Sequence, residues 1–243
     1  TFSSNSEGVT MMVRLKDDLA DNSERFIEIA NAIDATTTNR YTLDKTQGKL
    51  RFFCEGLNLM IDSGQREVWY DYNEDMVNKF IEITGVVDNN SSKLYINGAL
   101  VDIQYFEGDI NHVMTEGENK TIGIANNFSA WPTNATIDKA LIWNKPLSSE
   151  EINQYFETDE TPSSDNLIAF YDFNSGLGTT LYDKSGNQNH GAIYDAQWIV
   201  NTILGDLNGD ASIDVIDVVM LVSIIAFEDG YNELGDMNAD GIL

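Results

Sequence analysis

The chain has 243 residues, of which 42% are hydrophobic, and its 14 basic and 40 acidic residues give a net charge of −26. This length allows one large domain with a small appendage, and the apolar content allows a packed core. The charge excludes nucleic acid and anionic membrane surfaces as partners, because contacts to phosphate need clustered lysine and arginine side chains. No apolar run reaches membrane-spanning length, so we expect no membrane insertion.

Residues 1–201 are predicted to form one all-β domain. Short alternating or β-branched runs separated by turn residues are typical of a sandwich or barrel. The runs are VTMMVRL, RFIEIA, KLRFFCE, KFIEITGVV, KLYI, ALVDIQYF, KTIGIA, ATIDKALIW and NLIAFYDF. Asn97-Gly98 predicts a type I′ hairpin turn. The single cysteine, Cys54, excludes an internal disulfide and is expected to pack within its strand.

One helix is predicted in this domain, within PLSSEEINQYF. Ser148 can cap its start, and Glu151 three residues later completes a capping box. Leu147 before the cap can pack on Ile152. The segment ETDETPSSDN that follows is expected to be a surface connection.

Residues 202–243 form a second predicted module, built on an acidic loop and an apolar helix. The loop DLNGDASIDVID places oxygen-bearing residues at positions one, three, five, seven, nine and twelve, which is the spacing of a calcium loop. These residues are Asp206, Asn208, Asp210, Ser212, Asp214 and Asp217. Mg²⁺ fits less well, because it requires a smaller octahedral shell and keeps several waters. We therefore expect bound Ca²⁺.

The run GDLNGD…IDVIDVV followed by GDMNADGI resembles a type I dockerin, a duplicated calcium-loop-and-helix module. In the second loop Asp236, Asn238 and Asp240 hold positions one, three and five, and Ile242 would offer its carbonyl at position seven. The sequence ends at Leu243, before position twelve, so it resembles a truncated dockerin. The resemblance implies a cohesin-type domain as the partner.

The helix after the first loop is apolar on nearly all sides, with Val218, Leu221, Val222 and Ile225 on one face. Two interpretations are open. The helix packs against the β domain, or it presents a surface to a partner.

The stretch from KFIEITGVVDNNSSKLYINGALV through TIDKALIWNKPLSSEEI resembles the laminin-G-like, concanavalin A-like jelly roll. The resemblance covers most of residues 1–200 and implies a β-sandwich. The segment NLIAFYDFNSGLGTTLYDKSGNQNHGAI resembles the opening of such a domain, although it follows the helix here. We expect residues 167–199 to complete the same sandwich, and the alternative is that they begin a second jelly roll.

Two groups of aromatic side chains are candidate ligand-binding residues. Phe128 and Trp131 lie among turn formers, where burial is less automatic than in a strand, and Trp69, Tyr70 and Tyr72 in WYDYNED offer a second patch. A further cluster of oxygen ligands, equally compatible with a structural calcium site and with a plain turn, consists of Asp183, Asn187 and Asn189.

Catalysis within these residues is not expected. The run from Glu157 to Glu160 is the nearest carboxylate pair, but it lies in a predicted connection, and neither His112 nor His190 lies near a nucleophile pattern. The sequence therefore favours a secreted bacterial-type module, extracellular or at the cell surface. Its function would be non-catalytic carbohydrate binding or adhesion within a polysaccharide-degrading protein, with a glycan ligand. The alternatives are a glycoside hydrolase of this fold and a structural spacer made rigid by calcium.

Overall fold

The computed structural model of the protein describes residues 7–17, 23–32, 38–55, 66–107, 119–124, 132–160, 165–199, 205, 207 and 213–227. The chain divides into two compact units, Thr1–Tyr194 and Asp195–Leu243. The boundary expected between residues 201 and 202 stays a prediction.

Thirteen strands and two helices occur in the described residues. In chain order they are β1 (Gly8–Asp17), β2 (Glu24–Ala32), β3 (Thr38–Thr46), β4 (Lys49–Glu55), β5 (Val68–Asp71), β6 (Phe80–Asp88), β7 (Ser91–Ile96), β8 (Ala99–Tyr105), β9 (Asn119–Ile122), β10 (Ala135–Trp143), α1 (Ser149–Thr158), β11 (Leu167–Tyr171), β12 (Thr180–Leu181), β13 (Gly191–Ala192) and α2 (Val215–Phe227).

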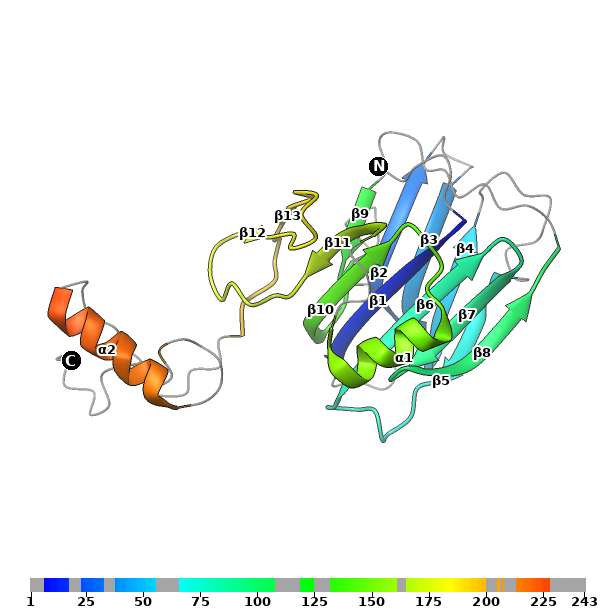
Figure 1. The fold of residues 1–243 in the computed structure, drawn as a ribbon. Helices are drawn as coiled ribbons and strands as arrows, with labels where there is room; N and C mark the ends of the chain where they lie inside the picture. Colours follow the sequence, from blue (N-terminus) through cyan, green and yellow to red (C-terminus); the bar gives the residue numbers. More distant parts are fainter. Residues whose placement is uncertain are drawn as a thin grey trace. The chain divides into compact units, whose positions relative to one another are not determined.

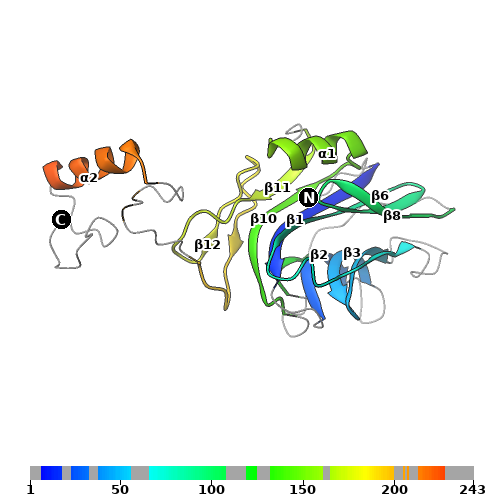
Figure 2. The same ribbon diagram turned by 90° about the horizontal axis from the view of Figure 1, so that it is seen from below.

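The first unit is a β-sandwich of two antiparallel sheets. A six-stranded sheet has the order β11-β10-β1-β6-β7-β8, and a five-stranded sheet has the order β5-β4-β3-β2-β9. The two sheets form separate layers, with α1 on the outer side of the six-stranded sheet (Figures 1 and 2). The expectation of a sandwich is confirmed.

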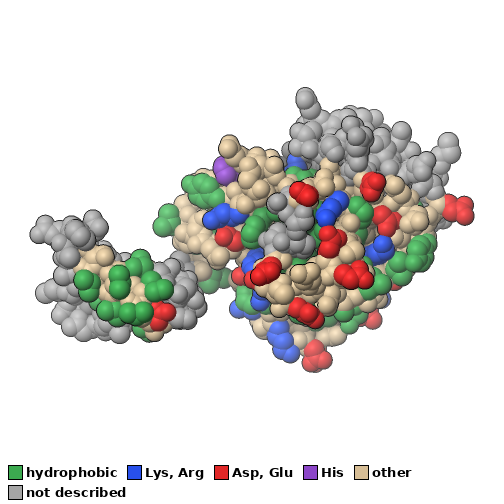
Figure 3. Space-filling model, viewed as in Figure 1, with side chains coloured by type: hydrophobic (Ala, Val, Ile, Leu, Met, Phe, Trp, Pro, Cys, Tyr) green, Lys and Arg blue, Asp and Glu red, His purple; other side chains and the backbone are tan. Residues whose placement is uncertain are grey.

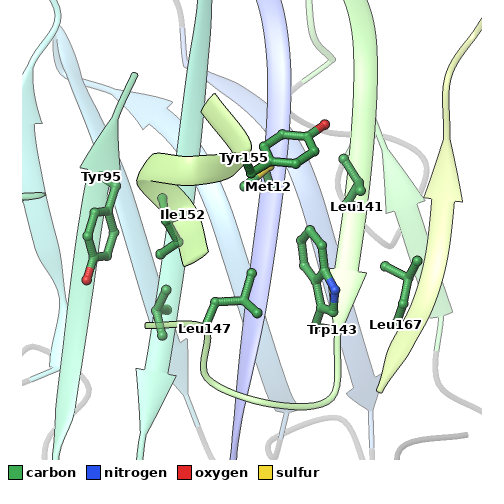
Figure 4. Packing of buried hydrophobic residues seen from close by; sticks show 9 residues of the cluster. Met12, Tyr95, Leu141, Trp143, Leu147, Ile152, Tyr155 and Leu167 are labelled. Carbon is green, nitrogen blue, oxygen red and sulfur yellow. The ribbon is translucent and has the colours of Figure 1, made fainter. Parts of the chain in front are cut away.

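The central part of the six-stranded sheet is buried on both faces, because one face meets the other sheet and the opposite face meets α1. On the inner face Gly85 of β6 lies against Phe52 of β4, so closely that a Cβ atom there would be 2.2 Å from the ring. On the outer face Trp143, Tyr95 and Ile152 belong to a cluster that packs between the sheet and α1 (Figure 4). Continuous burial along β6 follows from this double cover.

The local motifs that were expected around α1 and the β7–β8 hairpin are confirmed. Ser148 caps α1, and the reciprocal bond from the Ser148 backbone to Glu151 is present. Asn97 and Gly98 have φ angles of 49° and 76°, which is the left-handed pair that a type I′ turn requires. Cys54 is buried, as expected, and burial raises the pKa of its thiol to about 11.

The segment 167–199 belongs partly to the sandwich and partly to a separate small sheet. Its first part, β11, pairs with β10 and forms an edge of the six-stranded sheet. Its second part contains β12 and β13, which pair only with each other as a small two-stranded sheet.

Two strands of the five-stranded sheet had no counterpart among the predicted runs, namely β3 and β5. In β3 the residues Arg40, Thr42 and Asp44 alternate with Tyr41 and Leu43, so the strand has polar groups on one face. Asp44 and Thr42 are nevertheless fully buried. Their burial depends on partners from neighbouring strands, which the local pattern does not reveal.

The described part of the second unit is dominated by α2, the apolar helix expected after the first acidic loop. Valines at 215, 218, 219 and 222 are each more than half exposed, and hydrophobic side chains cover the visible face of this helix (Figure 3). No helix within the described residues has the length and apolar character needed to cross a membrane.

Candidate functional site

An open cavity of about 380 Å³ lies along β5, at the edge of the five-stranded sheet. The residues that line it are Lys49, Trp69, Tyr70, Asp71 and Asn73. Its volume is at the small end of the range for ligand cavities, about 300 Å³ and upward. The lining combines aromatic rings with an ammonium group, a carboxylate and an amide.

Contacts to both sheets hold β5 in place. It pairs with β4, so that Lys49 lies opposite Asp71 and Arg51 lies opposite Trp69. The Trp69 backbone N–H also donates to Asp102 of β8 in the other sheet, at 2.8 Å. The cavity wall is therefore fixed by rigid elements on two sides, which favours a pre-formed binding surface.

Arg51 supports the aromatic side of the cavity. Its guanidinium carbon lies 5.0 Å from the ring centroid of Trp69 and 4.3 Å from that of Phe53, which are cation–π distances. Asp44 accepts two hydrogen bonds from Arg51, at 3.0 and 2.7 Å, and Glu67 lies at 3.5 Å. Burial works to lower the pKa of Arg51, but the bonds and charge of Asp44 outweigh it and raise this pKa.

The same face of β2, β3 and β4 carries further ion pairs. Arg40 binds Glu55 through two nitrogens, at 2.6 and 2.5 Å. Arg25 lies 3.1 Å from both Glu28 and Asp44. Alternation of charge across neighbouring strands therefore stabilises the polar face, since opposite charges on facing strands attract.

Of the five expected ligand-binding aromatics, the structure brings Trp69 and Tyr70 into the cavity. Tyr72 is buried, with the Lys45 ammonium 4.8 Å from its ring centroid and its hydroxyl donating to the Asp17 carbonyl. Its ring is therefore enclosed by protein, and we leave it out of the candidate site. Phe128 and Trp131 lie outside the described residues.

The cluster of Asp183, Asn187 and Asn189 forms a hydrogen-bonded loop. The Asp183 carboxylate accepts bonds from the backbone N–H groups of Phe170, Ser185 and Asn189 and from the Ser185 hydroxyl. The Asn187 and Asn189 amide nitrogens donate to the Ile168 carbonyl. These bonds lower the pKa of Asp183, although burial acts in the opposite direction. These bonds are the ones that a plain turn would make, and the structural calcium site at these residues stays a prediction.

Most of the expected calcium ligands lie outside the described residues: Asp206, Asn208, Asp210, Ser212, Asp236, Asn238, Asp240 and Ile242. Asp214 and Asp217 are described. The buried Asp217 carboxylate accepts N–H bonds at 2.8 Å from Leu207, at loop position two, and from Asp214. It thus joins the start of the loop to the first turn of α2. Within the described residues no group of His, Cys, Asp and Glu is arranged to hold a metal.

One buried carboxyl group had no counterpart in the sequence analysis. Glu82 of β6 is only 5% exposed, and burial, the largest effect, raises its pKa to about 7. It is the sole charged residue in the run from Phe80 to Val87, a signal that could have drawn attention to it.

The other described residues considered for catalysis lie apart from the cavity lining. Asp159, from the acidic run at the end of α1, pairs with Lys139. His190 accepts a bond from the Asp183 backbone, and His112 is outside the described residues.

Two layered antiparallel sheets define the class of the protein as a β-sandwich. The sequence matches the family described as the Concanavalin A-like lectin/glucanases superfamily, of laminin G type, over residues 3–153. The chain belongs to this family. No curated protein matches the sequence.

Solved structures share the fold at low identity. A Bacteroides ovatus protein described as a candidate carbohydrate-binding protein is similar with a TM-score of 0.55 and 11% identity, over 83% of this chain and 58% of that one. The CBM40 module of the Ruminococcus gnavus IT-sialidase is similar with a TM-score of 0.50 and 16% identity, over 62% of this chain and 83% of that one. A mutant NanB sialidase from Streptococcus pneumoniae has a TM-score of 0.51 and 15% identity, over 65% of this chain and 24% of that one. The chain thus spans little more than half of the Bacteroides ovatus protein.

Proposed function

We propose that the chain is a non-catalytic carbohydrate-binding or adhesion module that binds a glycan in the cavity along β5. The single observation that carries the proposal is the cavity lining, in which the Trp69 indole stands beside hydrogen-bonding groups on a rigid edge. A sugar has apolar C–H faces and many hydroxyl groups, so it needs both kinds of contact. The relatives of the same fold that are named for carbohydrate binding support this choice.

The Trp69 ring has one side occupied by Arg51 and lines the cavity. A sugar ring would stack on the cavity side, while Asp71 and Lys49, which lie on the same face of the sheet as Trp69, would bond its hydroxyls. The Lys49 ammonium can donate, and the Asp71 carboxylate accepts. Because Arg51 and Asp102 fix the position of Trp69, little conformational entropy would be lost on binding.

Replacement of Trp69 by alanine tests the site. We expect Trp69→Ala to weaken binding to every glycan that the native chain binds on an array by at least about tenfold, because a stacked tryptophan is typically a binding hot spot. Tyr194→Ala is the matched control, since Tyr194 is 76% exposed and outside the cavity. Absence of binding to any glycan would overturn the function, and binding unaffected by Trp69→Ala would overturn the site.

We further propose that residues 202–243 act as a calcium-dependent dockerin-like segment, which attaches the module to a larger secreted polysaccharide-degrading protein or assembly outside the cell. The buried carboxylate of Asp217 lies in the first turn of α2, where a calcium loop needs its closing ligand, and this position supports the proposal. Asp217 and Asp214 would help to hold Ca²⁺, which would neutralise the acidic loop.

The attachment role requires binding to a cohesin-type domain. The exposed valines of α2 offer the apolar surface that such a partner would cover. We expect calorimetry to show binding in the presence of calcium and its loss in excess chelator. A complex that forms equally well in chelator would contradict the role of calcium.

A further inference from the structure

Two of the residues that line the cavity, Lys49 and Asp71, form an ion pair. We propose that Asp71, by pairing with Lys49, makes the cavity selective for neutral sugars over acidic ones. This inference rests on the proposed function and names the class of glycan that the same site accepts.

The cationic groups at the cavity already have carboxylate partners. The Lys49 ammonium lies 2.9 Å from Asp71, directly opposite it on the neighbouring strand. Behind the Trp69 ring, Arg51 is held by both oxygens of Asp44. Within the described lining, no cation is therefore left for the carboxylate of an acidic sugar.

An acidic sugar would meet two unfavourable effects. To reach Lys49 it would have to displace Asp71, whose side chain is 79% exposed and lies at the cavity. The chain also carries a net charge of −26, and a field of this sign repels anions at distances up to about 8 Å in physiological salt. A neutral sugar meets neither effect, and the Lys49–Asp71 pair can both donate to and accept from its hydroxyls.

Selectivity in this scheme comes from a repulsive group as well as from attractive ones. Asp71 lines the cavity and is more exposed than Lys49, so its negative charge acts on an anion that approaches Lys49. Asp71→Asn keeps the shape and the hydrogen-bonding capacity of the side chain, but it removes the negative charge and leaves Lys49 without its partner. The charge of Asp71 can therefore be tested separately from its size.

The experiment compares affinities for neutral glycans and their acidic counterparts, printed as matched pairs on one array with other neutral and acidic glycans. Lactose and 3′-sialyllactose form one pair, and a xylo-oligosaccharide with and without a glucuronic acid branch forms another. We expect the native chain to bind the neutral member of each pair more tightly than the acidic one, and equal affinities would overturn the proposed selectivity. We expect Asp71→Asn to raise the ratio of acidic to neutral affinity by about two- to fivefold, the range for one exposed ion pair. This gain should shrink at high salt.

Asp172→Asn is the control, because this substitution also removes one negative charge from an ion pair, that of Asp172 with Lys184, next to β11. An equal rise in that variant would mean that overall charge decides, and it would overturn the role of Asp71. A native preference for acidic members, lost in Trp69→Ala, would overturn neutral selectivity and leave the carbohydrate-binding function standing. Absence of binding to every glycan would overturn the function and this inference together.

Discussion

At the scale of single residues, the most unusual group is the carboxyl of Glu82. It is the only charged residue of β6 before the terminal Asp88, and its Oε1 atom has no hydrogen-bond partner among the described residues. Burial is the main cause of its raised pKa, and nearby Arg14 and Lys139 offset only part of the effect. At neutral pH this group is therefore poised between its charged and neutral forms.

The Glu82 carboxyl should make stability depend on pH. Between about pH 4.5, the ordinary pKa of the group, and about pH 7, the unfolded chain has lost the proton while the folded chain still holds it. The free energy of unfolding therefore falls as pH rises through this window, by about 3 kcal/mol. Glu82→Gln cannot ionise. We expect urea denaturation to show the variant gaining about that much relative to the native chain from pH 4.5 to pH 7.5, and a constant difference would refute this explanation.

At the scale of elements, the spacing of the two sheets depends on a glycine. Gly85 of β6 faces Phe52 of β4, and a Cβ atom at position 85 would overlap the ring at 2.2 Å. Since Phe52 and the opposite residue Met11 are fully buried, the ring has little room to move away. The glycine is therefore required by close packing between the sheets.

We expect Gly85→Ala to lower the free energy of unfolding by about 1–3 kcal/mol, the usual cost of overpacking a core. Thermal or urea denaturation measures the change. Gly176→Ala gives a comparison at a glycine with open space around it, where any loss would come from backbone conformation, since its φ is 66°. Native stability in Gly85→Ala would show that the sheets can separate slightly at no cost.

At the scale of the whole molecule, the two units should respond differently to calcium. Ligand binding to the folded state stabilises it by about 2.7 kcal/mol when the free ion is at one hundred times its dissociation constant. We expect calorimetry to show that added calcium raises the melting temperature of the second unit and leaves that of the sandwich unchanged, and that chelator reverses the effect. Asp217→Ala should abolish the shift. Melting that is the same in calcium and chelator would remove the basis for the dockerin-like proposal.

The sequence was sufficient where neighbouring residues decide the structure. The capping box of α1, the type I′ turn at Asn97-Gly98 and the period of most strands depend on groups a few residues apart. The resemblance to the laminin G family rested on the same local motifs, and the family is confirmed. The candidate ring Trp69 was found because it belongs to the aromatic patch in WYDYNED, yet its place in a cavity required the pairing of β5 with β4.

Tertiary structure alone decided the features that depend on charges brought together from distant strands. In β3 the charged residues obscured the strand, and their burial is possible because Arg25 and Arg51 reach Asp44 from β2 and β4. The contact of Lys45 with the Tyr72 ring and the pairing of Lys49 with Asp71 also join residues that are distant in the sequence. A sequence states which groups are charged, but the cost of burying each one depends on its partner across the sheet, and only folding determines that partner.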